Sequence, residues 1–129
     1  MTGHPSTFLL RSAAVLGSTG VGAGAFGAHA LKNTLEKQNN GVDNWKTAVM
    51  YQLIHATALL AMSALASGSS KSTVQAYEKA GKFMAAGVCI FSGSIYCLVL
   101  DVGPKKVTGP LTPVGGLLMV GGWVALGLM

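Results

Sequence analysis

The stretch Thr47–Ser67, TAVMYQLIHATALLAMSALAS, decides how the rest of the chain is interpreted. Its 21 residues carry no permanent charge, and Tyr51, Gln52 and His55 form one polar corner within it. At about 1.5 Å of rise per residue, an α-helix of this length is roughly 30 Å long, which is the thickness of the hydrocarbon core of a bilayer. The stretch therefore predicts a membrane-spanning helix with one polar corner.

The composition of the whole chain agrees with a membrane location. Of its 129 residues 50% are hydrophobic and only 10% are charged, and the mean hydropathy is +0.51. Soluble domains carry about 25% charged residues to cover a surface that faces water. We therefore expect a single membrane domain over residues 1–129, surrounded by the lipid bilayer.

The net charge of +5 is the balance of nine basic residues, Arg11 and eight lysines, against four acidic ones, and the basic residues all lie outside or at the ends of the apolar runs. Such residues anchor helices at lipid headgroups. They are not clustered with aromatic residues on one face, so we expect no binding of nucleic acid. The lysines and arginine also divide almost evenly between the two sides of the membrane and favour neither orientation.

Four uncharged runs are long enough to be spanning helices, over residues 13–31, 47–67, 83–100 and 111–129. The first helix is expected to run a turn or two past Lys32, and Asp43 to cap the helix that becomes the second span. Residues 101–113 contain three prolines and are expected to form a rigid turn. The predicted fold is all-α, a four-helix transmembrane bundle.

Glycines in the first run recur every three or four residues, at Gly17, Gly20, Gly24 and Gly27, within about 80° of a helical projection. In lipid such a stripe lets a second helix approach closely. The competing interpretation, a cleaved signal peptide, is less favoured because the run exceeds the usual 7–15 apolar residues. We expect helix packing at these glycines, and also at Gly93, Gly115 and Gly116.

Polar residues inside the spans are the candidates for a functional site. His55 lies about 13 Å along the helix from Lys46, near the middle of the membrane, where a histidine needs a hydrogen-bonding partner. The favoured hypothesis is a packing histidine that bonds Tyr51, Ser92 or Ser94; the alternative is a proton relay or ligand site. The full set of candidate polar residues is His29, Tyr51, Gln52, His55, Ser92 and Ser94.

Catalytic residues, metals and cofactors are not predicted. His29, near the membrane interface, and His55 differ by about 9 Å in depth, so they are poorly placed as axial haem ligands. Cys89 and Cys97 lie about 12 Å apart on another helix, too far apart for a disulfide and without the close spacing of zinc ligands. No phosphate-binding loop and no nucleophile–base pair stands out. We therefore expect that the protein is not an enzyme.

Several short motifs agree in order and spacing with one known family. They are GAFGAHALK at residues 24–32, Trp45, TAV at 47–49, YQ at 51–52, HA at 55–56, FSGS at 91–94, Tyr96, TP at 112–113, GG at 115–116 and GW at 122–123. From about residue 13 onward, the chain resembles the small integral membrane proteins called YgdD-like in bacteria and the transmembrane-protein-256 family in eukaryotes. That family is a domain of unknown function.

The resemblance implies a four-helix protein of a bacterial inner membrane or an organelle membrane, and it supplies no activity, substrate or catalytic residue. Our leading hypothesis is a small multi-pass protein that acts as a structural or partner-binding bundle, with other membrane protein subunits as its candidate partners. The alternative is a small carrier or proton-coupled channel with a polar path at Tyr51, Gln52 and His55.

Overall fold

The computed structural model describes residues 6–129 of the chain. Over these residues the protein forms five α-helices and no β-strand. The helices are α1 (Thr7–Ala28), α2 (Lys32–Glu36), α3 (Gly41–Ala66), α4 (Lys71–Val99) and α5 (Lys105–Gly127). The prediction of an all-α fold is therefore confirmed. The single domain predicted for residues 1–129 includes residues 1–5, which lie outside the described part.

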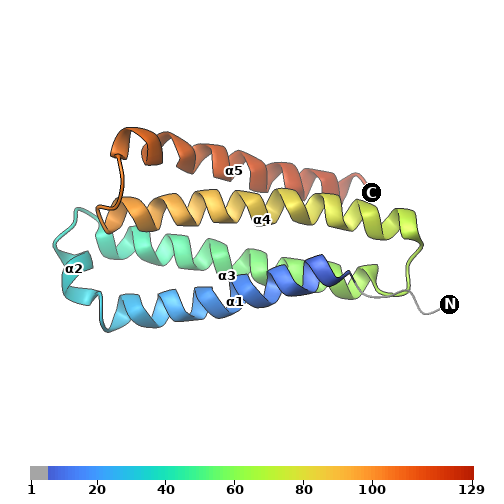
Figure 1. Cartoon of the computed structure of the whole chain (residues 1–129), viewed down its shortest axis with the longest axis horizontal. Helices are drawn as coiled ribbons and strands as arrows, with labels where there is room; N and C mark the ends of the chain where they lie inside the picture. The colour runs from blue at the N-terminus through green and yellow to red at the C-terminus, as the bar shows by residue number, and fades with distance from the viewer. Residues whose placement is uncertain (1–5) are drawn as a thin grey trace.

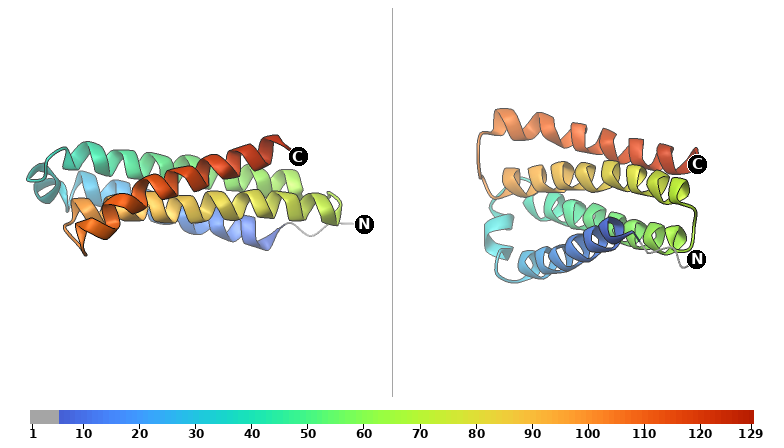
Figure 2. Two further views of the ribbon diagram at one scale, coloured as in Figure 1. Left: turned by 90° about the horizontal axis from the view of Figure 1, so that it is seen from above. Right: turned by 45° about the vertical axis from the view of Figure 1, so that its right-hand side comes forward.

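The four long helices lie side by side in the order α1, α3, α4, α5, and each is antiparallel to its neighbour (Figures 1 and 2). The main packing pairs are α1 with α3, α3 with α4, and α4 with α5. The arrangement is thus closer to a twisted row than to a closed bundle, with α1 and α5 on opposite sides of the central pair. The short α2 covers the end at which α1 stops and α3 begins.

Three of the helices are long and apolar enough to cross a membrane by length and composition, namely α3, α4 and α5. These correspond to the second, third and fourth predicted spans. The first predicted span belongs to α1, which has 22 residues but is not among the three. Arg11 and the glycines, serines and threonine of α1 lower its mean hydropathy.

Two predicted helix boundaries near α2 are wrong. The first helix does not continue past Lys32; it ends at Ala28, and the backbone N–H of His29 bonds the carbonyl oxygens of Ala25 and Phe26. The chain turns there because Leu35 of α2 folds back into a buried cluster with Trp45 and Val99. The cap of α3 is Asn40, in the left-handed conformation at a φ of 54°, and Asp43 instead lies in the first turn of α3.

The expected proline-rich turn is largely helix. Pro104 is the N-cap of α5, and the helix continues through Pro110 and Pro113. Neighbouring helices and Ser or Thr side chains compensate for the N–H groups that proline removes in membrane helices. Thr112, beside Pro113, joins α5 to α4 through its side chain, because its Oγ1 lies 2.6 Å from the Oγ of Ser94.

The apolar core has two parts along the length of the row. Near the start of α1, all four long helices contribute to one buried cluster, formed by Leu9, Ala13, Leu16, Ala56, Leu59, Met62, Ala66, Ala80, Met84, Val88 and Met119. The second, smaller cluster is that of Leu35, Trp45 and Val99 at the opposite end. Along α3, the buried polar residues Gln52 and His55 lie between Trp45 of the second cluster and Ala56 of the first.

Candidate polar site between the helices

Gln52 joins three helices through its side-chain amide. Its Nε2 donates to the carbonyl oxygen of Leu16 at 3.0 Å and to Oγ1 of Thr19 at 2.8 Å, both on α1. Its Oε1 accepts a hydrogen bond from the hydroxyl of Tyr96 on α4 at 2.8 Å. Gln52 is only 5% exposed, so each of these bonds satisfies a group that could not reach water.

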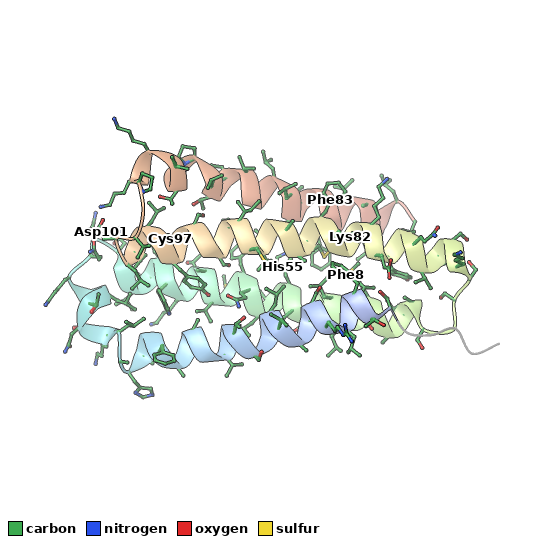
Figure 3. The ribbon with its side chains drawn as sticks, in the orientation of Figure 1. Phe8, His55, Lys82, Phe83, Cys97 and Asp101 are labelled. Carbon is green, nitrogen blue, oxygen red and sulfur yellow. The ribbon has the colours of Figure 1, made fainter. Side chains whose placement is uncertain are left out.

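His55 lies one helical turn further along α3 and is 4% exposed (Figure 3). Its Nδ1 is 2.7 Å from the backbone carbonyl oxygen of Tyr51, and Trp123 of α5 donates its indole N–H to Nε2 at 3.0 Å. Because the carbonyl can only accept and the indole can only donate, these partners place the single ring proton on Nδ1. A neutral imidazole therefore satisfies both contacts.

Ser92 and Ser94 do not bond His55, contrary to the expectation that either could be its partner. Ser92 donates to the backbone carbonyl oxygen of Ala48 at 2.7 Å and so connects α4 to α3. Ser94 donates to the carbonyl oxygen of Phe91 at 2.8 Å and also meets Thr112 of α5. The two serines thus serve two different helix interfaces.

The remaining candidates lie apart from this network. Tyr51 is 37% exposed, and its ring packs against Phe91, with ring centroids 4.7 Å apart. Only its backbone carbonyl bonds His55, although the two rings also stack at 6.2 Å. His29 is exposed at the end of α1, so the structure does not bring it together with Gln52 or His55.

The sequence did not indicate that Thr19 bonds Gln52. Tyr96 and Trp123 were recognisable only as part of the family motifs, and not as partners of Gln52 and His55. Thr19 is one of several hydroxyl residues in a glycine-rich run, and nothing in its spacing distinguishes it. Tyr96 and Trp123 are aromatic residues near helix ends, where aromatic residues commonly sit at the membrane interface. Their bonds to Gln52 and His55 span 44 and 68 residues of sequence, so no local pattern reveals them.

Every buried side-chain nitrogen and oxygen atom in the described part of the chain has a hydrogen-bond partner. Over residues 6–129, no three His, Cys, Asp or Glu side chains are grouped closely enough to hold a metal ion. Cys89 is exposed on α4 and Cys97 is partly buried, and both are free thiols. The polar groups of α3 therefore act, as the structure stands, by bonding neighbouring helices.

The glycine stripe of α1 faces α3. A Cβ atom added at Gly17 would lie 3.9 Å from Cβ of Ala56, and one at Gly24 would lie 3.4 Å from a methyl group of Val49. At Gly20 the added atom would overlap the side chain of Leu53, at 2.8 Å. At Gly27 it would overlap the indole of Trp45, whose N–H donates to the carbonyl oxygen of Ala23 at 2.8 Å.

Glycines also bring α4 and α5 close together. A Cβ atom at Gly115 would clash with the backbone nitrogen of Phe91 and would lie 2.7 Å from the carbonyl oxygen of Gly87. Gly116 has only an ordinary contact at 3.9 Å, and a Cβ at Gly93 would meet nothing within 4 Å. Gly87 belongs to the same crossing, although its pairing with Gly115 could not be recognised from the sequence.

Comparison with known proteins places the chain in a family. The model of the protein family of unknown function DUF423 matches residues 23–116. A UPF0382 membrane protein of Staphylococcus aureus is 42% identical over 106 residues, which cover 82% of this chain and 80% of that protein. A UPF0382 membrane protein of Schizosaccharomyces pombe is 36% identical over 118 residues, covering 88% of this chain and 93% of the relative.

The UPF0382 inner membrane protein YgdD of Escherichia coli is 35% identical over 122 residues, which cover 94% of this chain and 87% of YgdD. No solved structure matches the chain. The names of these relatives, all membrane proteins, agree with the apolar helices described above. The chain therefore belongs to the DUF423 family of UPF0382 membrane proteins, a family of helical membrane proteins of unknown function.

Proposed function

We propose that the protein is a non-enzymatic, four-helix integral membrane protein whose role is structural or partner-binding. The observation that carries this proposal is that the buried side chains of Gln52, His55 and Ser92 each form a hydrogen bond to a neighbouring helix. Polar groups used in this way stabilise the association of helices in lipid. They are not held ready for a reacting molecule.

In this proposal α1 is the fourth spanning helix. Its 22 residues would extend about 33 Å, which is enough to cross the hydrocarbon core. Arg11 is exposed in the second turn of α1, from where a long side chain can extend its charged group towards the headgroups. The close packing of Gly20 and Gly27 against α3 would hold α1 within the membrane domain.

A partner-binding role is supported by the outer face of α5. Leu117 is 71% exposed, Val120 57% and Val124 53%. Apart from its packing on α4, α5 is joined to the row through the bond between Trp123 and His55. A large apolar face of this kind is suited to lipid or to the helix of another membrane protein subunit.

The carrier or channel alternative has no specific support. Gln52 and His55 already have partners, and the hydroxyl groups of Ser92 and Ser94 bond other helices. A flux assay in proteoliposomes tests this alternative directly. Equal ion flux for the parent and for His55→Ala is expected, whereas a flux that depends on His55 would favour the carrier.

The proposed architecture is tested by washing membranes with alkaline carbonate and by labelling both termini. The protein should remain with the membrane, and tags on the two termini should be accessible from the same side, as four spans require. Termini on opposite sides would contradict α1 as a span. For partner binding, purification in mild detergent should retain a stoichiometric membrane protein, and a solitary monomer would contradict that part of the proposal.

A further inference from the structure

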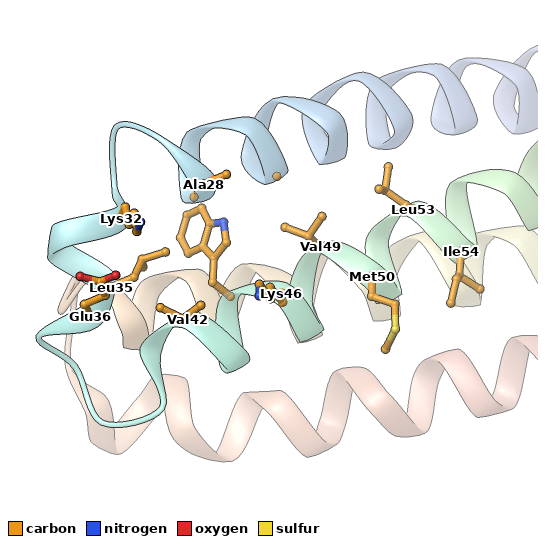
Figure 4. A pocket seen from close by; sticks show the side chains of 13 residues that line it. Ala28, Lys32, Leu35, Glu36, Val42, Lys46, Val49, Met50, Leu53 and Ile54 are labelled. Atoms are coloured by element: carbon orange, nitrogen blue, oxygen red, sulfur yellow. The ribbon is translucent and has the colours of Figure 1, made fainter.

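A groove of about 560 Å³ lies between α1, α2 and α3 at the end of the molecule covered by α2 (Figure 4). We call it the α1–α3 groove. Gly24 and Gly27 line it on the α1 side, where they lie close to Val49 and Trp45 of α3 and form one wall of the groove. Met50 and Ile54 line it on α3 and are each 51% exposed, so the groove is open along the outer surface of the row. Its volume is in the range of sites that bind small molecules.

The polarity of the groove changes along its length. Lys32 and Glu36 on α2 and Lys46 on α3 line the end near the loops (Figure 4). Beyond Lys46 the lining on α3 is apolar as far as Ile54, a distance of about 12 Å along the helix. A charged end followed by an apolar channel that runs along a spanning helix matches the order of headgroup and acyl chain in a lipid leaflet.

We propose that the α1–α3 groove binds one anionic phospholipid, with its phosphate between Lys32 and Lys46 and one acyl chain along Met50, Leu53 and Ile54. The two lysines outnumber Glu36, so the charged end has a net positive charge that complements a lipid phosphate. Basic pockets between membrane helices bind the headgroups of anionic lipids in this way. Glu36 could then accept a hydrogen bond from a headgroup hydroxyl.

An acyl chain fits the apolar part better than a protein segment does. The lining there combines backbone at Gly24 with the flexible side chains of Met50 and Leu53, and a chain of methylene groups can follow such a surface without leaving polar backbone groups unpaired. A peptide helix in the same place would need its own close-packing face. The groove is also part of the surface that the bilayer covers, so the lipid is already present at high local concentration.

The test uses the full-length protein in mild detergent and native mass spectrometry, with phosphatidylglycerol and phosphatidylcholine of identical acyl chains as probes. The parent should retain phosphatidylglycerol more tightly than phosphatidylcholine. The double variant Lys32→Gln and Lys46→Gln should bind phosphatidylglycerol about 30-fold more weakly, as expected for the loss of two lysines at the membrane surface. The matched control, Lys105→Gln with Lys106→Gln, removes the same charge at the same end of the molecule but outside the groove, and should bind like the parent.

A second variant tests the groove without changing its charge. Ala28 is exposed and lines the groove, so Ala28→Phe should obstruct it and weaken the binding of phosphatidylglycerol while the helix content measured by circular dichroism stays unchanged. Equal retention of the two lipids by the parent, or equal weakening by the two pairs of lysine substitutions, would overturn the proposal. So would a dimer of the chain that dissociates in Ala28→Phe, because the groove would then be an interface between two copies.

Discussion

At the scale of single residues, the buried side chains of Gln52 and His55 on α3 are each bonded to other helices. Gln52 bonds two other helices, and His55 bonds a third through Trp123. The sequence indicated both as candidate polar residues and predicted that His55 needs a hydrogen-bonding partner in lipid. It could not identify the partners, because Tyr96 and Trp123 lie on helices whose rotation and depth relative to α3 are decided only by packing.

Replacing Gln52 by Leu keeps most of the side-chain volume and removes the interhelical bonds to Leu16, Thr19 and Tyr96. We expect a loss of about 2 kcal/mol in the free energy of unfolding, since each interhelical bond in a membrane contributes about 0.6 kcal/mol. This change in the free energy of unfolding is measured by titrating SDS into mixed micelles and monitoring helix content by circular dichroism. Thr57→Val is the control, because Thr57 bonds only its own helix, at the carbonyl oxygen of Leu53, and should change stability by less than about 0.5 kcal/mol.

The bond between His55 and Trp123 should make substitutions at the two positions non-additive. A double-mutant cycle with His55→Phe and Trp123→Phe is expected to give a coupling energy of about 1 kcal/mol, measured by the same unfolding experiment. Lys105→Gln, at the other end of α5, should show no coupling to His55→Phe. Additive effects of the two aromatic substitutions would mean that this contact contributes nothing to holding α5.

At the scale of elements, the helices form because their apolar runs are long enough to satisfy their own backbone hydrogen bonds in lipid. This requirement is local, so the apolar parts of α3, α4 and α5 followed from the sequence, although α4 begins at Lys71, twelve residues before the predicted span. The boundaries at α2 and at the start of α5 did not. The first helix ends before α2, and Leu35 of α2 is buried against Trp45 and Val99. α5 continues through Pro110 and Pro113 while Thr112 contacts Ser94 of α4. Each of these boundaries depends on contacts with residues far away in the sequence.

Adjacent glycines of α5 provide a matched test of the α4–α5 crossing. Gly115→Ala should lower the free energy of unfolding by about 1–3 kcal/mol, because the added methyl group meets the backbone of Gly87 and Phe91, which cannot rotate away. Gly116→Ala adds the same methyl group where the nearest atom is 3.9 Å away, and it should be neutral or slightly stabilising. Thermal unfolding in detergent compares the two. Equal effects of the two substitutions on stability would contradict close packing at Gly115, because the higher helix propensity of alanine favours both variants alike.

At the scale of the whole molecule, the helices are arranged in a row in which α3 and α4 have two long neighbours each. This order leaves the outer face of α5 and the α1–α3 groove exposed on the outside of the row. The number of apolar runs predicted the number of long helices. It did not predict the row, because four helices of this length can pack in several orders that bury similar areas.

A disulfide test addresses the pairing of α1 with α3. In a background with Cys89→Ala and Cys97→Ala, cysteines placed at Gly17 and Ala56 should form a disulfide on mild oxidation, because their Cβ atoms would be 3.9 Å apart, within the usual range for disulfides. Trypsin cleaves between the two positions, so the linked peptides should separate on reduction and can be followed by mass spectrometry. The pair Gly22→Cys and Ala56→Cys is the control and should stay unlinked, since a Cβ at Gly22 meets nothing within 4 Å.

The sequence by itself determined that this protein is helical and belongs in a membrane, because run length, scarcity of charge and backbone hydrogen bonding act within each segment. The glycine spacing of α1 likewise indicated a face for close packing. Only the tertiary structure decided which helix meets that face, which aromatic residues bond Gln52 and His55, and where a groove remains open. These features depend on the relative rotation and depth of separate helices, which are set by contacts between residues far apart in the chain.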